Sequence, residues 1–166
     1  MAVYPLICVV DTSIIIDLYR GEILAEFFKL PYVFVTADVI LEELKKPDGK
    51  LLIEFGLRID ELEGSYVLEI FQLRIIHRKP SVNDLFAFML AKNLNATLLT
   101  NDGSLRKVTQ QYKIPVHGIL WILDEMVRLD VLLNHQATRA LHFICDSGSH
   151  LPQDECDKRF STWSSE

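Results

Sequence analysis

The stretch Ser81–Arg106, SVNDLFAFMLAKNLNATLLTNDGSLR, decides the fold class of this chain of 166 residues. Ser81 followed three residues later by Asp84 is a capping-box pattern, and the apolar residues after it recur at helical spacing. Ala96–Thr100 is a short apolar run that predicts a buried strand, and the Asn-Asp-Gly after it predicts a turn. A helix, a buried strand, a turn and a second helix are typical of a parallel sheet covered by helices.

The same alternation extends in both directions from this stretch. Apolar, β-branched runs predict further buried strands at Leu6–Val10, Tyr32–Thr36 and Ile114–His117, and an alternating run predicts an edge strand at 57–62. Helical periodicity predicts helices over 14–19, 22–30, 38–46, 104–112, 119–129 and 134–144, and 66–76 is compatible with a strand or a helix, of which we favour the helix. We therefore expect one three-layer α/β/α domain with a mostly parallel sheet over residues 1–144, and a polar, partly ordered tail over 145–166.

The composition excludes several classes of protein. No run reaches the roughly 18–20 apolar residues that a membrane span needs. The apolar segment Met1–Val10 is short and no basic residue precedes it, so we interpret it as a strand and not as a secretion signal. Cys8, Cys145 and Cys156 are odd in number and widely spaced, which fits a reducing cytoplasm and argues against a disulfide framework or a zinc site.

The net charge of −6 argues against a nucleic-acid binder, which usually has a basic surface. A cluster of metal-binding acids would itself contribute several of these charges, and two divalent ions would offset about four of them. The charge is therefore compatible with a site at which cations mediate the contact with nucleic acid.

Two acids follow buried strands of the predicted sheet. Asp11 comes directly after the first strand and Asp102 follows Thr100, so both are expected at the carboxyl edge, where ligands of such sheets bind. A carboxylate at the rim of an apolar core needs a partner, and no Lys or Arg lies beside Asp11 in the sequence. Oxygen ligands without nearby His or Cys suit Mg²⁺ or Mn²⁺, ions that assist phosphodiester hydrolysis.

Each acid taken alone also has a structural interpretation. Asp11 is a favoured residue for a helix cap, and Asp84 completes the capping box begun by Ser81. Asp102 suits a turn, and Glu43 suits an exposed helix position paired with a following lysine. The functional interpretation therefore depends on the acids together.

Four segments resemble the PIN-domain family, and within it the VapC-like toxins of bacteria and archaea: VVDTSIIIDL at 9–18, VILEEL at 39–44, the stretch 81–106, and IPVHGILWILDEM at 114–126. The resemblance covers about residues 5–144. It implies that the metal-binding and catalytic acids are Asp11, Glu43 (rather than its neighbour Glu42), Asp84 and Asp102, supported by the hydroxyls of Ser13 and Thr100.

The resemblance also implies an activity and partners. A PIN-like enzyme would hydrolyse RNA phosphodiester bonds with Mg²⁺ or Mn²⁺, would form a homodimer, and in the VapC-like branch would be inhibited by an antitoxin protein. Among the basic residues near the acids, we single out Arg106 as a contact for the RNA phosphate. Trp121 lies within an apolar helical run and is expected in the core or an interface.

Two other functions remain open from the sequence. One is a catalytically inactive PIN-like module that binds RNA or protein. The other is an acyl- or phosphoryl-transfer enzyme with Asp11 as nucleophile. The second lacks support, because the chain has no G-x-S-x-G or glycine-rich phosphate loop and has Ser13 where a phosphatase would need a second acid.

Overall fold

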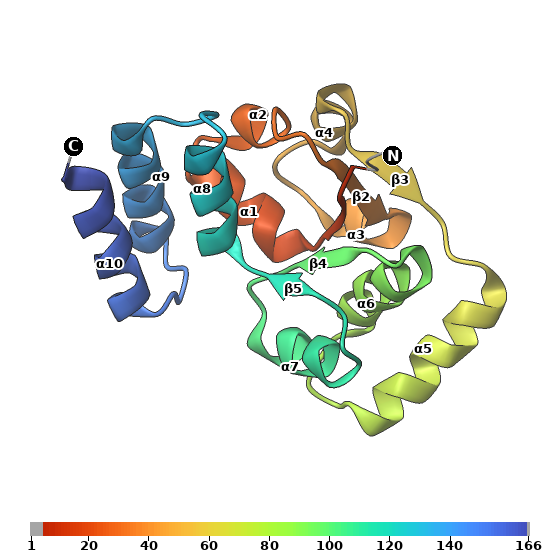
Figure 1. Cartoon of the computed structure of the whole chain (residues 1–166). Helices are drawn as coiled ribbons and strands as arrows, with labels where there is room; N and C mark the ends of the chain where they lie inside the picture. Colours follow the sequence, from red (N-terminus) through yellow and green to blue (C-terminus); the bar gives the residue numbers. More distant parts are fainter. Residues whose placement is uncertain (1–4, 166) are drawn as a thin grey trace, which may run out of the picture.

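The structure, a computed structural model, describes residues 5–165 and is built around a five-stranded parallel sheet (Figure 1). The strands stand in the order β3-β2-β1-β4-β5, and each neighbouring pair is parallel. Their bounds are β1 Ile7–Val10, β2 Val33–Ala37, β3 Arg58–Asp60, β4 Thr97–Leu99 and β5 Val116–His117. The predicted α/β class is confirmed, and so is the predicted edge strand, which is β3.

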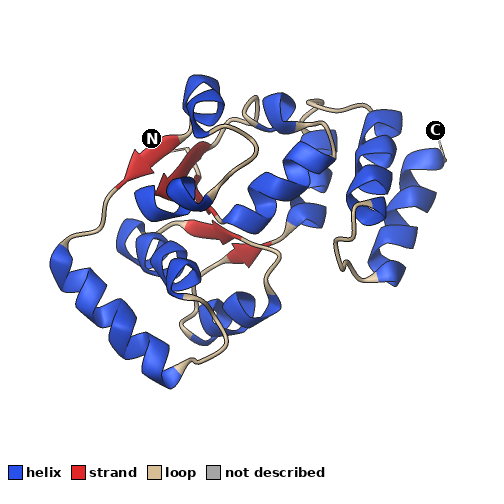
Figure 2. Cartoon of the chain, turned by 180° about the vertical axis from the view of Figure 1, so that it is seen from behind, coloured by secondary structure: helices blue, strands red, loops and turns tan. Residues whose placement is uncertain are grey.

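Helices cover both faces of the sheet, as the views from the two sides show (Figures 1 and 2). One core includes buried residues of α1 Thr12–Arg20, α2 Leu24–Phe27, α4 Gly49–Phe55, α8 Ile119–Arg128, α9 Asn134–Asp146 and α10 Gln153–Ser164. The opposite core includes those of α3 Asp38–Glu43, α5 Gly64–Ile76, α6 Val82–Leu94 and α7 Gly103–Gln111. The molecule is therefore the expected three-layer sandwich.

The central strand β1 explains why the predicted strands are uniformly apolar. Cys8 and Val10 belong to the first core and Val9 to the second, and all three are fully buried. Side chains alternate across a strand, so a strand covered by helices on both faces needs apolar residues at every position.

The order of the strands reverses beside β1, because the chain first adds β2 and β3 on one side and later adds β4 and β5 on the other. Val10 pairs with Leu99, so the residues after β1 and β4 emerge side by side at the carboxyl edge. Open α/β sheets bind ligands in the crevice at this switch point. The topology alone thus places Asp11 and the residues after Leu99 where such sheets bind ligands.

Residues 38–55 depart from the sequence-based expectation. The helix predicted to reach Lys46 ends at Glu43, because Leu44 adopts an extended backbone and Pro47 disfavours helical geometry in the residue before it. A helix that was not predicted, α4, then begins after Asp48, whose side chain accepts a hydrogen bond from the Lys50 backbone. The aspartate cap was a usable signal for this helix.

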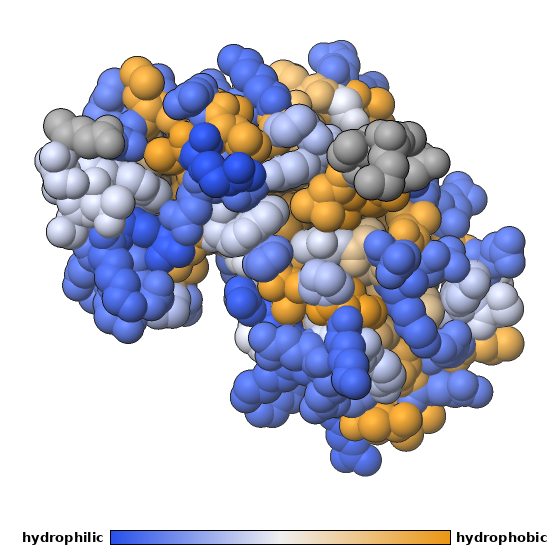
Figure 3. Space-filling view, viewed as in Figure 1, coloured by the Kyte–Doolittle hydropathy of each residue, from blue (hydrophilic) through white to orange (hydrophobic). Residues whose placement is uncertain are grey.

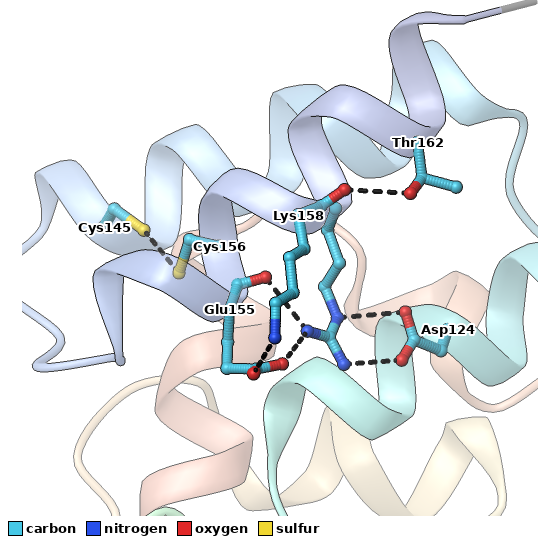
Figure 4. A network of polar contacts seen from close by, with 7 residues as sticks. Asp124, Cys145, Glu155, Cys156, Lys158 and Thr162 are labelled. Atoms are coloured by element: carbon cyan, nitrogen blue, oxygen red, sulfur yellow. Dashed lines mark hydrogen bonds and ion pairs between the residues drawn. The ribbon is translucent and has the colours of Figure 1, made fainter.

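The C-terminal residues are ordered as the helix α10, which packs beside α9 (Figure 1). Trp163 is buried in the first core. Arg159 forms a two-pronged ion pair with Asp124 of α8, at 3.0 and 2.7 Å, and also pairs with Glu155 (Figure 4). The thiols of α9 and α10 also face one another, with the sulfurs of Cys145 and Cys156 4.0 Å apart.

No helix within residues 5–165 is long and apolar enough to cross a membrane.

The burial of Trp163 predicts that α10 unfolds together with the rest of the domain. Trp163→Ala should lower the free energy of unfolding by about 3 kcal/mol, because a large buried side chain is lost. Ser161→Ala, an exposed position of the same helix, is the control and should change it by less than about 0.5 kcal/mol. Urea titrations followed by circular dichroism measure both, and equal midpoints would show that α10 is not part of the cooperative unit.

Candidate active site

Asp11 is buried at the carboxyl edge, with 4% of the residue exposed. Its Oδ2 accepts hydrogen bonds from the hydroxyls of Thr100, at 2.7 Å, and Ser13, at 3.0 Å. These hydroxyls accept in turn from backbone N–H groups: Asp102 donates to Thr100 and Asn101 donates to Ser13. Both hydroxyl protons are thereby directed at one oxygen of Asp11, and the carboxylate is held in one orientation.

Burial dominates the protonation of Asp11. It raises the pKa of the carboxyl to about 6; the negative charge of Asp84 adds to the rise, and the Thr100 and Ser13 hydroxyls oppose it. Relative to the ordinary value of about 3.9, this corresponds to roughly 3 kcal/mol against the charged form. The ionised carboxylate is therefore a local source of instability, and a nearby cation would relieve it.

Asp84 and Asp102 each perform a structural task with one carboxylate oxygen. Asp84 Oδ2 accepts from the Ser81 backbone at 2.8 Å and completes the predicted capping box of α6. Asp102 caps α7, and its Oδ1 accepts from the Leu105 backbone at 2.8 Å and from Ser104 at 2.6 Å. These bonds fix both side chains, and the second oxygen of each carboxylate lies outside them.

Glu43 is the exposed member of the set, at the last residue of α3. It accepts hydrogen bonds from Thr12, at 2.8 Å, and from the side-chain amide of Asn83 on α6. The structural interpretation from the sequence was that Glu43 pairs with a following lysine. Within the described residues, no lysine forms an ion pair with it. Its contacts instead link the end of α3 to the residues beside Asp11 and Asp84.

The charge of Asp84 interacts with those of the other three acids. Burial raises the pKa of Asp84, and the negative charges of Asp102 and Glu43 raise it further. The hydrogen bonds from Ser81 lower it. Asp84 in turn raises the pKa of Asp11. An acidic centre of this kind attracts cations, and its donor atoms are all oxygen, which suits Mg²⁺ or Mn²⁺.

The carboxylates do not form a closed cage. Among residues 5–165, no three Asp, Glu, His or Cys side chains are close enough to enclose one metal ion. Mg²⁺ usually retains several waters and takes only one or two carboxylates together with substrate phosphates, so an open arrangement fits its chemistry better than that of zinc or calcium. A divalent cation at these acids would therefore need further ligands from water or from a substrate.

Two polar residues of this edge were missed by sequence reasoning. Asp17 is buried one helical turn after Ser13, and it accepts hydrogen bonds from Asn101 and Ser149. The Asn101 side chain also accepts from the backbone of Ile119 at 2.9 Å, so it joins α1 to the start of α8. The spacing of Ser13 and Asp17 on one helix face was a signal for the first, whereas Asn101 looked like ordinary turn chemistry.

Comparison with known proteins agrees with this fold. A family model described as a PIN domain matches residues 7–165, which includes α10. No curated protein sequence matches the chain significantly.

Two solved structures resemble the fold. A PilT N-terminus domain protein, SSO1118 from the hyperthermophilic archaeon Sulfolobus solfataricus P2, is 17% identical with a TM-score of 0.52, over 72% of this chain and 92% of that one. PAE2754 from Pyrobaculum aerophilum is 14% identical with a TM-score of 0.54, over 74% and 96%. At these identities the likeness supports the fold alone.

The buried charge of Asp11 predicts a pH-dependent stability in a chelating buffer. Because folding raises this pKa, the folded state binds more protons than the unfolded state between about pH 4 and pH 6, and its stability falls as pH rises through that window. Asp11→Asn removes this loss, and one amide oxygen can still accept from both hydroxyls. The variant should exceed the wild type by about 1–3 kcal/mol at pH 8 and by much less at pH 4.

Urea unfolding across pH 4 to 8 measures this difference. Asp146→Asn, which changes an exposed aspartate at the end of α9, is the control and should stay within about 0.5 kcal/mol of the wild type. An Asp11→Asn variant that is less stable than the wild type by the same amount at every pH would show that the hydrogen bonds of the carboxylate outweigh its burial.

Proposed function

Because the chain belongs to the PIN-domain family, a nuclease-type fold, we propose that it is a ribonuclease that hydrolyses RNA phosphodiester bonds with Mg²⁺ or Mn²⁺. The observation that carries the proposal is the set of coupled carboxylates at the switch point, centred on the buried Asp11. The charge of Asp84 raises the pKa of Asp11, and those of Asp102 and Glu43 raise the pKa of Asp84, so a cation bound among them would be stabilised.

In this proposal Asp11, Asp84 and Asp102 would hold the cation directly or through water, and Glu43 would help to hold it or a second one. The chemistry supplied by Mg²⁺ or Mn²⁺ at this position would be neutralisation of phosphate charge and a lower pKa for the attacking water. Ser13 and Thr100 keep the Asp11 carboxylate in place by donating to its Oδ2. Thr12 and Asn83 do the same for Glu43. Such preorganisation limits the reorganisation needed at the moment of reaction.

Arg106 is the proposed contact for an RNA phosphate. It lies one turn after Asp102 on α7, and within residues 5–165 no carboxylate forms an ion pair with it. Its guanidinium is thus free to bind phosphate with two parallel hydrogen bonds.

The narrower features of the proposal come from the resemblance to VapC-like proteins. They are that the enzyme is the toxin of a toxin–antitoxin pair, that an antitoxin protein inhibits it, and that it acts as a homodimer in the cytoplasm. Sedimentation of the purified chain tests the dimer, and co-purification with the product of a neighbouring gene tests the antitoxin.

The first test of the proposal is cleavage of RNA by freshly purified protein with Mn²⁺. Asp11→Asn and Asp102→Asn should each lower the rate by at least roughly 100-fold, and Asp146→Asn should retain it. Calorimetry should detect Mn²⁺ binding to the wild type and its loss in Asp11→Asn. Since Asp11→Asn is expected to be more stable than the wild type at neutral pH, its inactivity cannot be ascribed to unfolding.

Equal cleavage by all variants would identify a contaminating nuclease and contradict the assignment. A chain that binds RNA but neither binds Mn²⁺ nor cleaves would instead match the alternative, an inactive PIN-like RNA- or protein-binding module.

The adjacent acids Glu42 and Glu43 provide a matched pair for a second test. Both are exposed, and only Glu43 contacts Thr12 and Asn83. Glu43→Gln should lower the cleavage rate about 10- to 100-fold, and Glu42→Gln should change it less than about twofold. Equal effects of the two substitutions would show that general acidity, and not a positioned carboxylate, is what the reaction needs.

A further inference from the structure

A cavity of about 430 Å³ lies beside the acids, between α7, the start of α8 and α10. Figure 3 shows this side of the molecule hollowed between the surface of α9 and α10 and that of α7. The volume is in the range of small-molecule binding sites. Its lining includes Asn101, which precedes α7, and Arg159 of α10. The cavity therefore exists only when α10 is packed in place.

Asn101 joins this cavity to the acids. It lines the cavity, precedes Asp102, and donates its backbone N–H to Ser13. A second hollow, of about 360 Å³, is lined by Ser13 and Asp102 and shares Asn101, His150 and Leu151 with the cavity. A polynucleotide lying across Asp102 therefore has a path along this shared wall into the cavity.

Two arginines line the cavity, and they differ in their partners. Arg159 is neutralised by Asp124 and Glu155, and it holds α10 against α8. Arg106 has no such ion pair among the described residues. Gly118 makes room for it, because a Cβ at that position would lie 2.8 Å from Arg106 Nη1. Arg106 is thus the cation that this cavity offers to an anionic ligand.

An aromatic pair forms another part of the lining. The rings of His117 and Trp121 are stacked, with centroids 4.3 Å apart and planes 8° from parallel. Burial and the charge of Arg106 lower the pKa of His117, which favours the uncharged imidazole. Both residues are only partly buried, and Trp121 packs against the edge of the first core. Nucleic-acid bases stack on aromatic side chains of this kind.

We propose that this cavity binds one unpaired nucleotide of the RNA substrate, with its phosphate on Arg106 and its base against the His117–Trp121 pair. The proposal rests on the ribonuclease function proposed above, and it adds a nucleotide subsite beside the carboxylates. The cavity offers a cation to the phosphate of a nucleotide and an aromatic surface to its base. A base within a duplex is stacked on its neighbours and is not available to this surface. Cleavage is therefore directed to a bond next to an unpaired base.

The test is calorimetric titration with adenosine 5′-monophosphate, adenosine and inorganic phosphate, in a buffer with a chelator. Arg106→Ala should weaken the monophosphate about tenfold and leave adenosine unchanged. His117→Ala should weaken the monophosphate and adenosine about tenfold and leave phosphate unchanged, and His117→Phe should restore binding because it keeps a π-surface. Lys107→Ala, the adjacent exposed cation of α7 that does not line the cavity, is the control and should change binding less than about twofold.

Circular dichroism and urea midpoints establish that each variant is folded. If the monophosphate does not bind the wild type, or binds Arg106→Ala and Lys107→Ala equally, the subsite is disproved even where RNA is cleaved. If the wild type binds the monophosphate in the expected pattern but cleaves no RNA, the subsite stands and the ribonuclease proposal fails. Because the titrations need no catalysis, the two failures are distinguishable.

Discussion

The hydrogen bonds that hold the Asp11 carboxylate depend on the chain after β4 lying beside the end of β1. Thr100 and Ser13 both donate to the same oxygen, and the backbone of Asp102 and Asn101 supplies the donors that orient these hydroxyls. The parallel pairing of β1 with β4 places these groups within reach of one another. A shift of one residue in that pairing would exchange the faces of the strand and remove Asp11 from its network. The register of two short strands therefore sets the geometry of the whole candidate site.

Structural and functional interpretations of these acids are compatible. Asp84 belongs to a capping box and Asp102 caps a helix, yet each uses one carboxylate oxygen for that task. A helix cap restrains the side chain and leaves the other oxygen outside these bonds. Such an acid would bind a cation better than a freely rotating exposed acid would, because a restrained ligand loses less conformational entropy on binding. The burial of the charged Asp11 carboxylate lowers the stability of the folded protein. Such a cost is expected where a fold keeps a charge in place for a ligand.

The C-terminal helices extend the site beyond the sheet. Arg159 and Trp163 fix α10 against α8 and the first core. His150 and Leu151 lie just before α10. Together with Asn101 they line both hollows beside the acids. The same contacts enclose the cavity that contains Arg106 and the stacked rings of His117 and Trp121. The C-terminal segment therefore contributes to the surroundings of the acids and does not merely follow the domain.

The sequence by itself determined the order and type of most elements, because burial on both faces of a parallel sheet leaves a readable record in runs such as Leu6–Val10 and Ala96–Thr100. It also identified acids at strand ends, since the carboxyl edge follows from strand direction alone. Only the tertiary structure decided the partners of Asp17 and Asn101 and the partial burial of Trp121. These features depend on contacts between residues far apart in the chain, and local periodicity carries no information about such contacts.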